Sequence, residues 1–202
     1  MIRRLLLALA LAFAAPAFAQ NAATPTAPVQ ALNDGLMAVM HAGRKTPFPT
    51  RLATLQPIVE RSFDLPLILQ SSVGPRWASL PAEVKTELLA VFTQFTVASW
   101  VANFDAYDGE RLQILPELRR VGSDEVVQTR LTPRTGDVTR LDYVMRRIGD
   151  TWRVVDILLD GSISRVAVQR SDFRSLLASG DANALIASLR EKVASLAAGA
   201  GP

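Results

Sequence analysis

Apolar residues recur at helical spacing through the first half of the chain, as far as residue 107. The spacing predicts a helix over residues 31–43 and a long helix over residues 80–107, whose wide apolar stripe indicates that one face is buried. Two shorter helical segments are expected between them, one containing Pro57 and one following Asp64, a suitable N-cap. Because proline removes a backbone donor, we expect Pro57 to kink or break its helix.

The period of the apolar positions changes from about 3.6 residues to 2 after the long helix. This alternation predicts four strands, over residues 112–121, 125–132, 138–148 and 152–159. The intervening sequences GSD, TPRTGD and GD are typical of tight turns, which join antiparallel neighbours. We therefore expect an antiparallel meander.

The two faces of this sheet are expected to differ in polarity, because successive side chains point to opposite sides of a strand. Two sets alternate along the third strand, with Leu141, Tyr143 and Met145 on one face and Arg140, Asp142 and Arg146 on the other. One face is therefore predicted to be buried and the other largely wet. The fourth strand is apolar on both faces apart from Asp156, so we expect it to be covered on both sides.

Two further helices are predicted after the sheet, over residues 163–178 and 182–197. The order of elements indicates an α+β fold, with a four-stranded antiparallel twisted sheet clasped by N- and C-terminal helices around an apolar cavity. A chain of 202 residues fits one domain. We place that domain at residues 31–198, after a polar, proline-containing leader over residues 20–30 that we expect to be flexible.

The first residues are typical of an export signal. A basic MIRR segment precedes the apolar run LLLALALAFAAPAFA, which ends in an A-x-A cleavage sequence. We predict a signal peptide over residues 1–19, cleaved after Ala19, because the apolar run is too short to span a bilayer. No cysteine follows, which excludes a lipoprotein anchor, so we expect the mature protein in a bacterial periplasm.

The amino-acid composition excludes several classes of function. The chain has no cysteine and a single histidine, His41, which does not by itself make a zinc or Ser-His-Asp site. Lys and Arg number 22 against 19 Asp and Glu, and loss of Arg3 and Arg4 with the signal peptide lowers the net charge from +3 to about +1. We therefore expect no cofactor, no metal and no nucleic-acid partner.

A curved sheet with helices over its apolar face forms a cone, and a cone that side chains leave unfilled contains a dry pocket. We expect this pocket between the 80–107 helix and the apolar face of the sheet. The predicted lining residues are Leu88, Phe92, Phe95, Trp100, Phe104, Val127, Leu131, Leu141, Tyr143, Met145, Val155, Ile157, Leu159 and Val166. For any one of them, ordinary core packing is the simpler interpretation.

Three functions are compatible with these patterns. The first is a carrier for an apolar ligand. The second is a periplasmic enzyme acting on a small apolar substrate, with Asp156 as general base and Tyr143 as an acid–base candidate. No second acid, base or metal set accompanies Asp156, and a lone strand carboxylate more often bonds to the backbone or pairs with arginine. The third is an assembly factor whose apolar face is filled core.

Two long segments carry a resemblance to a known family. They are FDLPLILQSSVGPRWASLPAEVKTELLAVFTQFTVASWVANFDAYDGE in the helical half and WRVVDILLDGSISRVAVQRSDFRSLLASGDANALIASL near the C-terminus. Both resemble the MlaC, or toluene-tolerance, family of periplasmic lipid-binding proteins. The sequences GPRW, FDAYDGE and YVMRR are similar to its HpnM branch, which is associated with hopanoid biosynthesis.

The resemblance implies a non-enzymatic, soluble lipid carrier whose helices clasp acyl chains against a twisted sheet. Its cargo would be a hopanoid or a phospholipid, carried between an inner-membrane ABC lipid transporter complex and an outer-membrane partner. Most motif-bearing positions are expected to specify the fold, and they are Trp152, Asp156, Gly161, Ser162, Arg170 and Phe173. Gly161 is predicted to turn the chain so that the next helix folds back beside the pocket.

Three arginines follow that turn and allow two interpretations. Arg165, Arg170 and Arg174 either meet an anionic headgroup or form a solvated helix face, and the solvated face is slightly favoured.

Overall fold

The computed structural model describes residues 24–199, so the predicted signal peptide and the first residues of the leader lie outside the described residues. The first half of this region is helical, in agreement with the spacing of its apolar residues. Its elements are α1 (Thr26–Ala42), α2 (Phe48–Ser62), α3 (Leu65–Val73), the short 3-10 helix η1 (Gly74–Ser79) and α4 (Ala82–Asn103).

Two details of the helical half differ from the sequence-based expectation. Helix α1 begins at Thr26, so residues 26–30, which we assigned to a flexible leader, are helical because Val29 is fully buried in the core. Helix α2 runs through Pro57 without a break. Leu55 and Val59 are both fully buried on either side of this proline, and their burial holds the helix together across the missing hydrogen bond.

The second half forms one antiparallel sheet followed by two helices. The strands are β1 (Arg111–Val121), β2 (Asp124–Thr132), β3 (Thr139–Ile148), β4 (Thr151–Leu159) and β5 (Ile163–Ser164), in that spatial order. The helices are α5 (Arg165–Leu176) and α6 (Asn183–Ala197). The predicted meander is present, but the predicted number of four strands was wrong, because a two-residue strand is too short to show a periodicity.

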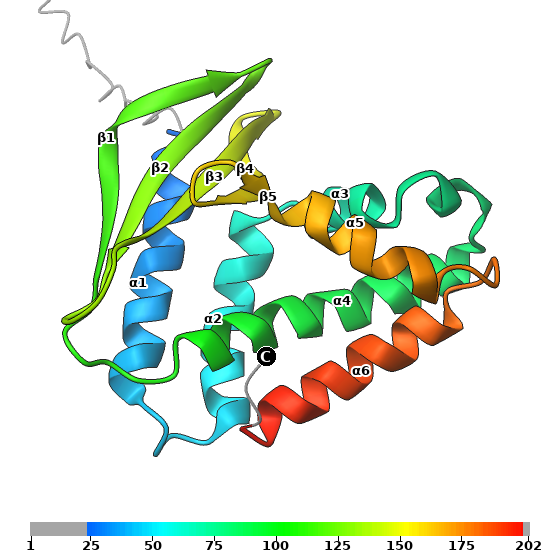
Figure 1. Cartoon of the computed structure of the whole chain (residues 1–202), viewed down its shortest axis with the longest axis horizontal. Helices are drawn as coiled ribbons and strands as arrows, with labels where there is room; N and C mark the ends of the chain where they lie inside the picture. The colour runs from blue at the N-terminus through cyan, green and yellow to red at the C-terminus, as the bar shows by residue number, and fades with distance from the viewer. Residues whose placement is uncertain (1–23, 200–202) are drawn as a thin grey trace, which may run out of the picture.

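The sheet lies across one end of the helices (Figure 1). Helices α1 and α2 pack side by side beneath it, and α4 passes between α5 and α6 with its C-terminal end toward the sheet. The main hydrophobic core joins the inner face of the sheet, which is the face turned toward the helices, to α1, α2, α4 and α6. None of the described helices is long and apolar enough to cross a membrane.

A β-bulge in the fourth strand changes which side chains face the helices. Val144 of β3 pairs with Asp156, but the next residue, Met145, pairs with Val154, so Val155 is an extra residue in the ladder. Val155 consequently joins a small apolar cluster on the outer face of the sheet with Val126. Our assignment of Val155 to the inner face was therefore wrong, because strict alternation does not continue through a bulge.

Candidate functional site

A cavity of about 340 Å³ lies between α4, the inner face of the sheet and α5. This volume is at the small end of the range of about 300–1,000 Å³ that is typical of ligand pockets. The predicted residues that line it are Phe92, Phe95, Trp100, Phe104, Leu131, Leu141, Ile157, Leu159 and Val166. Three exposed lining residues, Asn103, Thr139 and Arg165, mark its mouth.

Other residues that we predicted to line the pocket lie elsewhere. Leu88, Val127, Tyr143 and Met145 are fully buried in the solid core, and Val155 is on the outer face. The strand register explains the division, because Val127 pairs with Tyr143 toward the β3–β4 turn, whereas Leu131 pairs with Thr139 at the opposite end. Helices cover the inner face near Val127 and Tyr143, and they leave the cavity near Leu131. The alternation of side chains along a strand predicts which face a residue is on, but not whether helices cover that part of the face.

The cavity has a wall that sequence periodicity missed. Phe63, Leu65 and Ile68 line it from the α2–α3 junction and the first turns of α3. This junction reaches the sheet through a parallel bridge between Phe63 and Val154, and the Asp64 amide donates to the Val154 carbonyl at 2.9 Å. Such a contact joins residues about ninety positions apart and leaves no periodic signal in the sequence.

Aromatic rings form a continuous part of the wall. The ring centroids of Phe63 and Trp100 are 6.2 Å apart, and those of Trp100 and Phe104 are 5.5 Å apart. Both separations fall in the range of favourable aromatic pairs. The rings therefore hold one another in place while presenting an apolar surface to the cavity.

The polar side chains that α4 contributes to the wall are satisfied by the helix itself. The Thr96 and Ser99 hydroxyls donate to the carbonyls of Phe92 and Phe95, each at 2.8 Å, and the Asn103 amide donates to the Ser99 carbonyl at 2.7 Å. These groups were also missed, although they share the helical stripe of the predicted aromatics. Because the Thr96 and Ser99 hydroxyl donors are occupied, this part of the wall behaves as a largely dry surface.

Asp156 faces the cavity, but its carboxylate holds the chain in place. It accepts hydrogen bonds from the backbone amides of Ile157 at 2.8 Å and Val166 at 3.1 Å, and from the Ser164 hydroxyl at 2.5 Å. Ser164 in turn caps α5 by accepting from the Ala167 amide at 3.0 Å. The carboxylate thus ties β4 to the start of α5.

The arrangement gives no support to the enzyme hypothesis. Asp156 is the only carboxylate among the described lining residues, and its oxygens are occupied by structural donors. Tyr143 is buried in the core outside the cavity, and its burial raises the pKa of its phenol. Within residues 24–199, no group of three or more acidic or histidine side chains is arranged to hold a metal ion.

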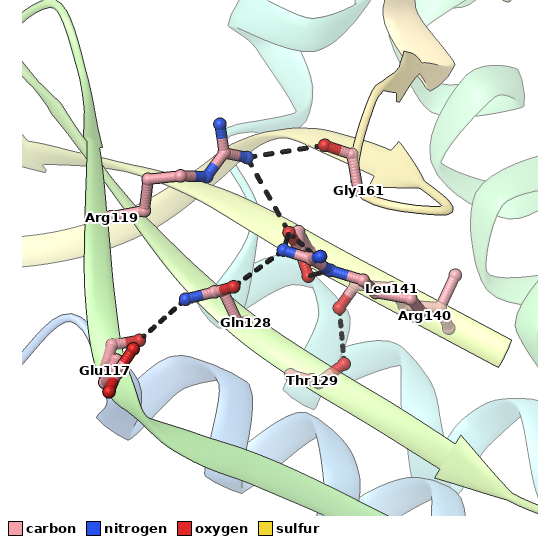
Figure 2. Close-up of polar contacts among 8 residues, drawn as sticks. Glu117, Arg119, Gln128, Thr129, Arg140, Leu141 and Gly161 are labelled. Carbon is pink, nitrogen blue, oxygen red and sulfur yellow. Dashed lines mark hydrogen bonds and ion pairs between the residues drawn. The ribbon is translucent and has the colours of Figure 1, made fainter. Parts of the chain in front are cut away.

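A polar network covers the outer face of the sheet behind the cavity (Figure 2). Asp142 is fully buried and accepts from the Arg140 guanidinium at 2.7 Å, while Arg119 lies 3.7 Å away. The hydrogen bond to Asp142 raises the pKa of Arg140. Arg140 also donates to the Gln128 side chain at 2.6 Å, and Arg119 donates to the Gly161 carbonyl at 3.4 Å. The network therefore joins three strands to the turn before α5.

Gly161 fits that turn for two separate reasons. Its φ of +75° is in the region that favours glycine, and a Cβ at this position would lie 2.9 Å from the Arg140 guanidinium. The turn and the Asp156 hydrogen bonds together place Leu159 and Val166 on the cavity wall. This agrees with the predicted role of the glycine in folding the next helix back beside the pocket.

The three arginines of α5 have different environments. The Arg170 guanidinium donates twice to the Ser71 carbonyl, at 2.8 and 2.6 Å, so it holds α5 to the end of α3. Arg174 is exposed and does not line the cavity. Arg165 is also exposed but lines the cavity at its mouth. The sequence had placed these three residues in one group, and the structure separates them.

Comparison with known proteins agrees with this architecture. The model of the family described as MlaC protein matches residues 30–191. A solved phospholipid-binding protein from Ralstonia solanacearum, in complex with a phospholipid, is similar with a TM-score of 0.74. The two sequences are 19% identical, and the match covers 87% of this chain and 99% of that chain. This likeness shows a shared fold. No curated protein matches the chain.

Proposed function

The chain belongs to the MlaC protein family, and from this we propose that it is a periplasmic lipid carrier without enzymatic activity. The observation that carries the proposal is the cavity of about 340 Å³, whose α4 wall combines aromatic side chains with internally bonded polar ones. The shared fold with a phospholipid-binding protein supports it. The predicted signal peptide supports the location.

A carrier of this kind overcomes the cost of moving lipid tails through water. Exposing apolar surface costs about 0.8 kcal/mol per methylene, so a tail of about sixteen carbons meets a barrier on the order of 12 kcal/mol. A dry wall removes much of that barrier by replacing water with Phe92, Phe95, Trp100 and the strand residues. The exposed mouth leaves a polar headgroup in contact with solvent.

The transport system around this carrier follows from the sequence resemblance. We propose that the protein accepts or delivers its lipid at an inner-membrane ABC lipid transporter complex and exchanges it with an outer-membrane partner. The proposed cargo is a phospholipid or a hopanoid. The motifs GPRW, FDAYDGE and YVMRR favour the hopanoid-associated branch of the family.

Native mass spectrometry of the protein isolated from its own periplasm tests the proposal. We expect a complex with bound lipid, released as chemically intact lipid when the protein is denatured. A protein that is folded, compact and empty would support the filled-core interpretation instead. Chemically altered lipid, lost in an Asp156→Asn variant, would support the enzyme.

A further inference from the structure

One polar side chain on the cavity wall is buried. Gln169 of α5 is only 9% exposed, and among the described residues that line the cavity it is the only one that is both buried and polar. The Thr96 and Ser99 hydroxyls on the same wall donate to their own helix. A buried side-chain amide also needs hydrogen-bond partners, because an unpaired donor in apolar surroundings is unfavourable.

One end of the Gln169 side-chain amide has a partner in the protein. The Ser72 hydroxyl of α3 lies within hydrogen-bond distance of Oε1 of Gln169, at 3.1 Å, and of the Ile68 carbonyl, at 2.8 Å. The other end, the Nε2 donor, has no acceptor among residues 24–199. Because Ser72 is itself fully buried, this contact holds the amide against α3 and leaves its N–H groups available to a ligand.

Other side chains with N–H donors do not share this combination of features. Asn33 in α1 is the other buried side-chain amide among the described residues, but it does not line the cavity. Asn103 lines the cavity but is exposed at its mouth, and it donates to the Ser99 carbonyl. The indole of Trp100 also lines the cavity and is half-buried. Gln169 therefore combines a place on the wall, burial and an unpaired donor.

Successive turns of α5 place this donor between the mouth of the cavity and the packed core. Arg165 is exposed at the mouth, and Gln169 follows four residues later, about 6 Å along the helix. Phe173, one turn further on, packs edge-on against Phe92 with ring centroids 6.5 Å apart, and it does not line the cavity. The donor thus stands about one helical turn inside the mouth, where a lipid whose polar end is at the mouth begins its chains.

We propose that the Gln169 side-chain amide donates a hydrogen bond to an ester carbonyl of the bound lipid, and that the carrier thereby distinguishes ester-linked from ether-linked chains. This inference rests on the proposed carrier function. An ester carbonyl is a neutral acceptor at the junction between the polar part of a lipid and its chains. It therefore pairs with the N–H group without bringing a charge into the apolar wall. An ether-linked chain has no carbonyl at this place and leaves the amide unpaired.

A competition between two lipids that differ only in this linkage tests the role of Gln169. The mature protein is equilibrated with alkyl-maltoside micelles containing equal amounts of a diacyl phosphatidylethanolamine and its dialkyl ether analogue, with chains of equal length, and bound lipids are counted by mass spectrometry. We expect about a tenfold preference for the diacyl lipid. Gln169→Met keeps the length of the side chain without the amide, so it should bring the ratio close to one while uptake persists. Gln70→Met removes an exposed amide outside the cavity and should keep the parental ratio.

The outcomes separate the role of Gln169 from the carrier function. Equal uptake of both lipids by the parent protein, or a preference that Gln169→Met retains, would overturn the role of Gln169 and leave the carrier function standing. Uptake of neither lipid would contradict the carrier function. If Gln169→Met does not fold, infrared spectra of the parent protein decide the matter. The carbonyl band of a bound diacyl lipid, isotope-labelled at its esters, should lie at a lower frequency than in dry hydrocarbon; a band at the hydrocarbon position would overturn the proposal.

Discussion

The two faces of the sheet use the same strands for opposite purposes. On the inner face, Leu141 and Ile157 border a cavity that the protein does not fill. On the outer face, the adjacent residue Asp142 is fully buried in a network with Arg140, and that network reaches Gly161. The comparison indicates that an unfilled binding wall is positioned by polar contacts on its reverse side, because the apolar residues around a cavity lack partners on one side.

A charged residue on the inner face is expected to have the largest effect on lipid binding. Leu141→Asp places an unpaired carboxylate beside the acyl chains, which is costly to desolvate. We expect the bound lipid to fall by more than tenfold while circular dichroism shows a folded protein. Val121→Asp changes an exposed residue on β1 and serves as the matched control, which should retain its lipid. Equal lipid content in the two variants would place the ligand elsewhere.

Breaking the outer-face network should chiefly lower stability. Arg140→Met leaves the buried Asp142 carboxylate with Arg119, at 3.7 Å, as its one remaining cation among residues 24–199. Since Arg140 is itself partly exposed, we expect the free energy of unfolding in urea to fall by about 2–3 kcal/mol. The control is Arg147→Met, which removes an exposed pair with Asp150 and should change that free energy by less than about 1 kcal/mol. Similar losses in both variants would remove the distinction between the buried and exposed pairs.

Two glycine variants distinguish the cost of backbone strain from the cost of steric contact with Arg140 at the Gly161 turn. Gly161→Ala adds a methyl group 2.9 Å from the guanidinium at a φ of +75°. Gly149→Ala adds only the backbone strain, because its φ is +59° and no described atom beyond its two chain neighbours lies within 4 Å of the added carbon. We expect a loss of about 1 kcal/mol for Gly149→Ala and a loss about twice as large for Gly161→Ala. Thermal and urea unfolding measure the stability of both variants. Equal losses of stability would argue against a steric contact between the added methyl group and Arg140.

The smallest effect is expected at Asp156. In Asp156→Asn, the remaining oxygen still accepts from Ile157 and Val166, and the new amide donates to the Ser164 hydroxyl in the reverse sense. The loss of a negative charge near the start of α5 should lower stability by less than about 1 kcal/mol. Bound lipid should remain, and it should be chemically identical to that of the parent. Accumulation of an unaltered precursor lipid in the variant alone would instead indicate catalysis.

Much of the fold follows from local patterns in the sequence. The long α4 stripe and the alternation along β2 and β3 predicted the two surfaces that enclose the cavity, and the spacing of turn residues predicted the meander. The aromatic residues of α4 and its C-cap, from Phe92 to Phe104, were predicted from the same stripe that buries the helix. Local periodicity is informative at these places because each element has one apolar face.

The remaining features depend on contacts that periodicity does not report. The bulge at Val155 turns the side chain of this predicted lining residue to the outer face of the sheet. The bridge from Phe63 to Val154 places the α2–α3 junction, which is distant in sequence, on the cavity wall. Tyr143 and Leu141 have the same strand phase, yet one is solid core and the other lines the cavity. Their difference comes from where the helices meet the sheet. The resemblance to the family indicated lipid binding without locating that boundary.

The most direct test of the account is whether a lipid tail touches the inner face near Trp100. The chain has three tryptophans, of which only Trp100 lines the cavity, and Trp152 stands about 13 Å along β4 from Asp156, the nearest residue of that strand on the cavity wall. Two single-tryptophan proteins are loaded with a lipid brominated along its acyl chain: Trp77→Phe with Trp152→Phe, and Trp77→Phe with Trp100→Phe. Bromine quenches indole fluorescence at short range. We predict strong quenching of Trp100 and little of Trp152; unquenched Trp100 in a protein shown to contain the lipid would contradict the account.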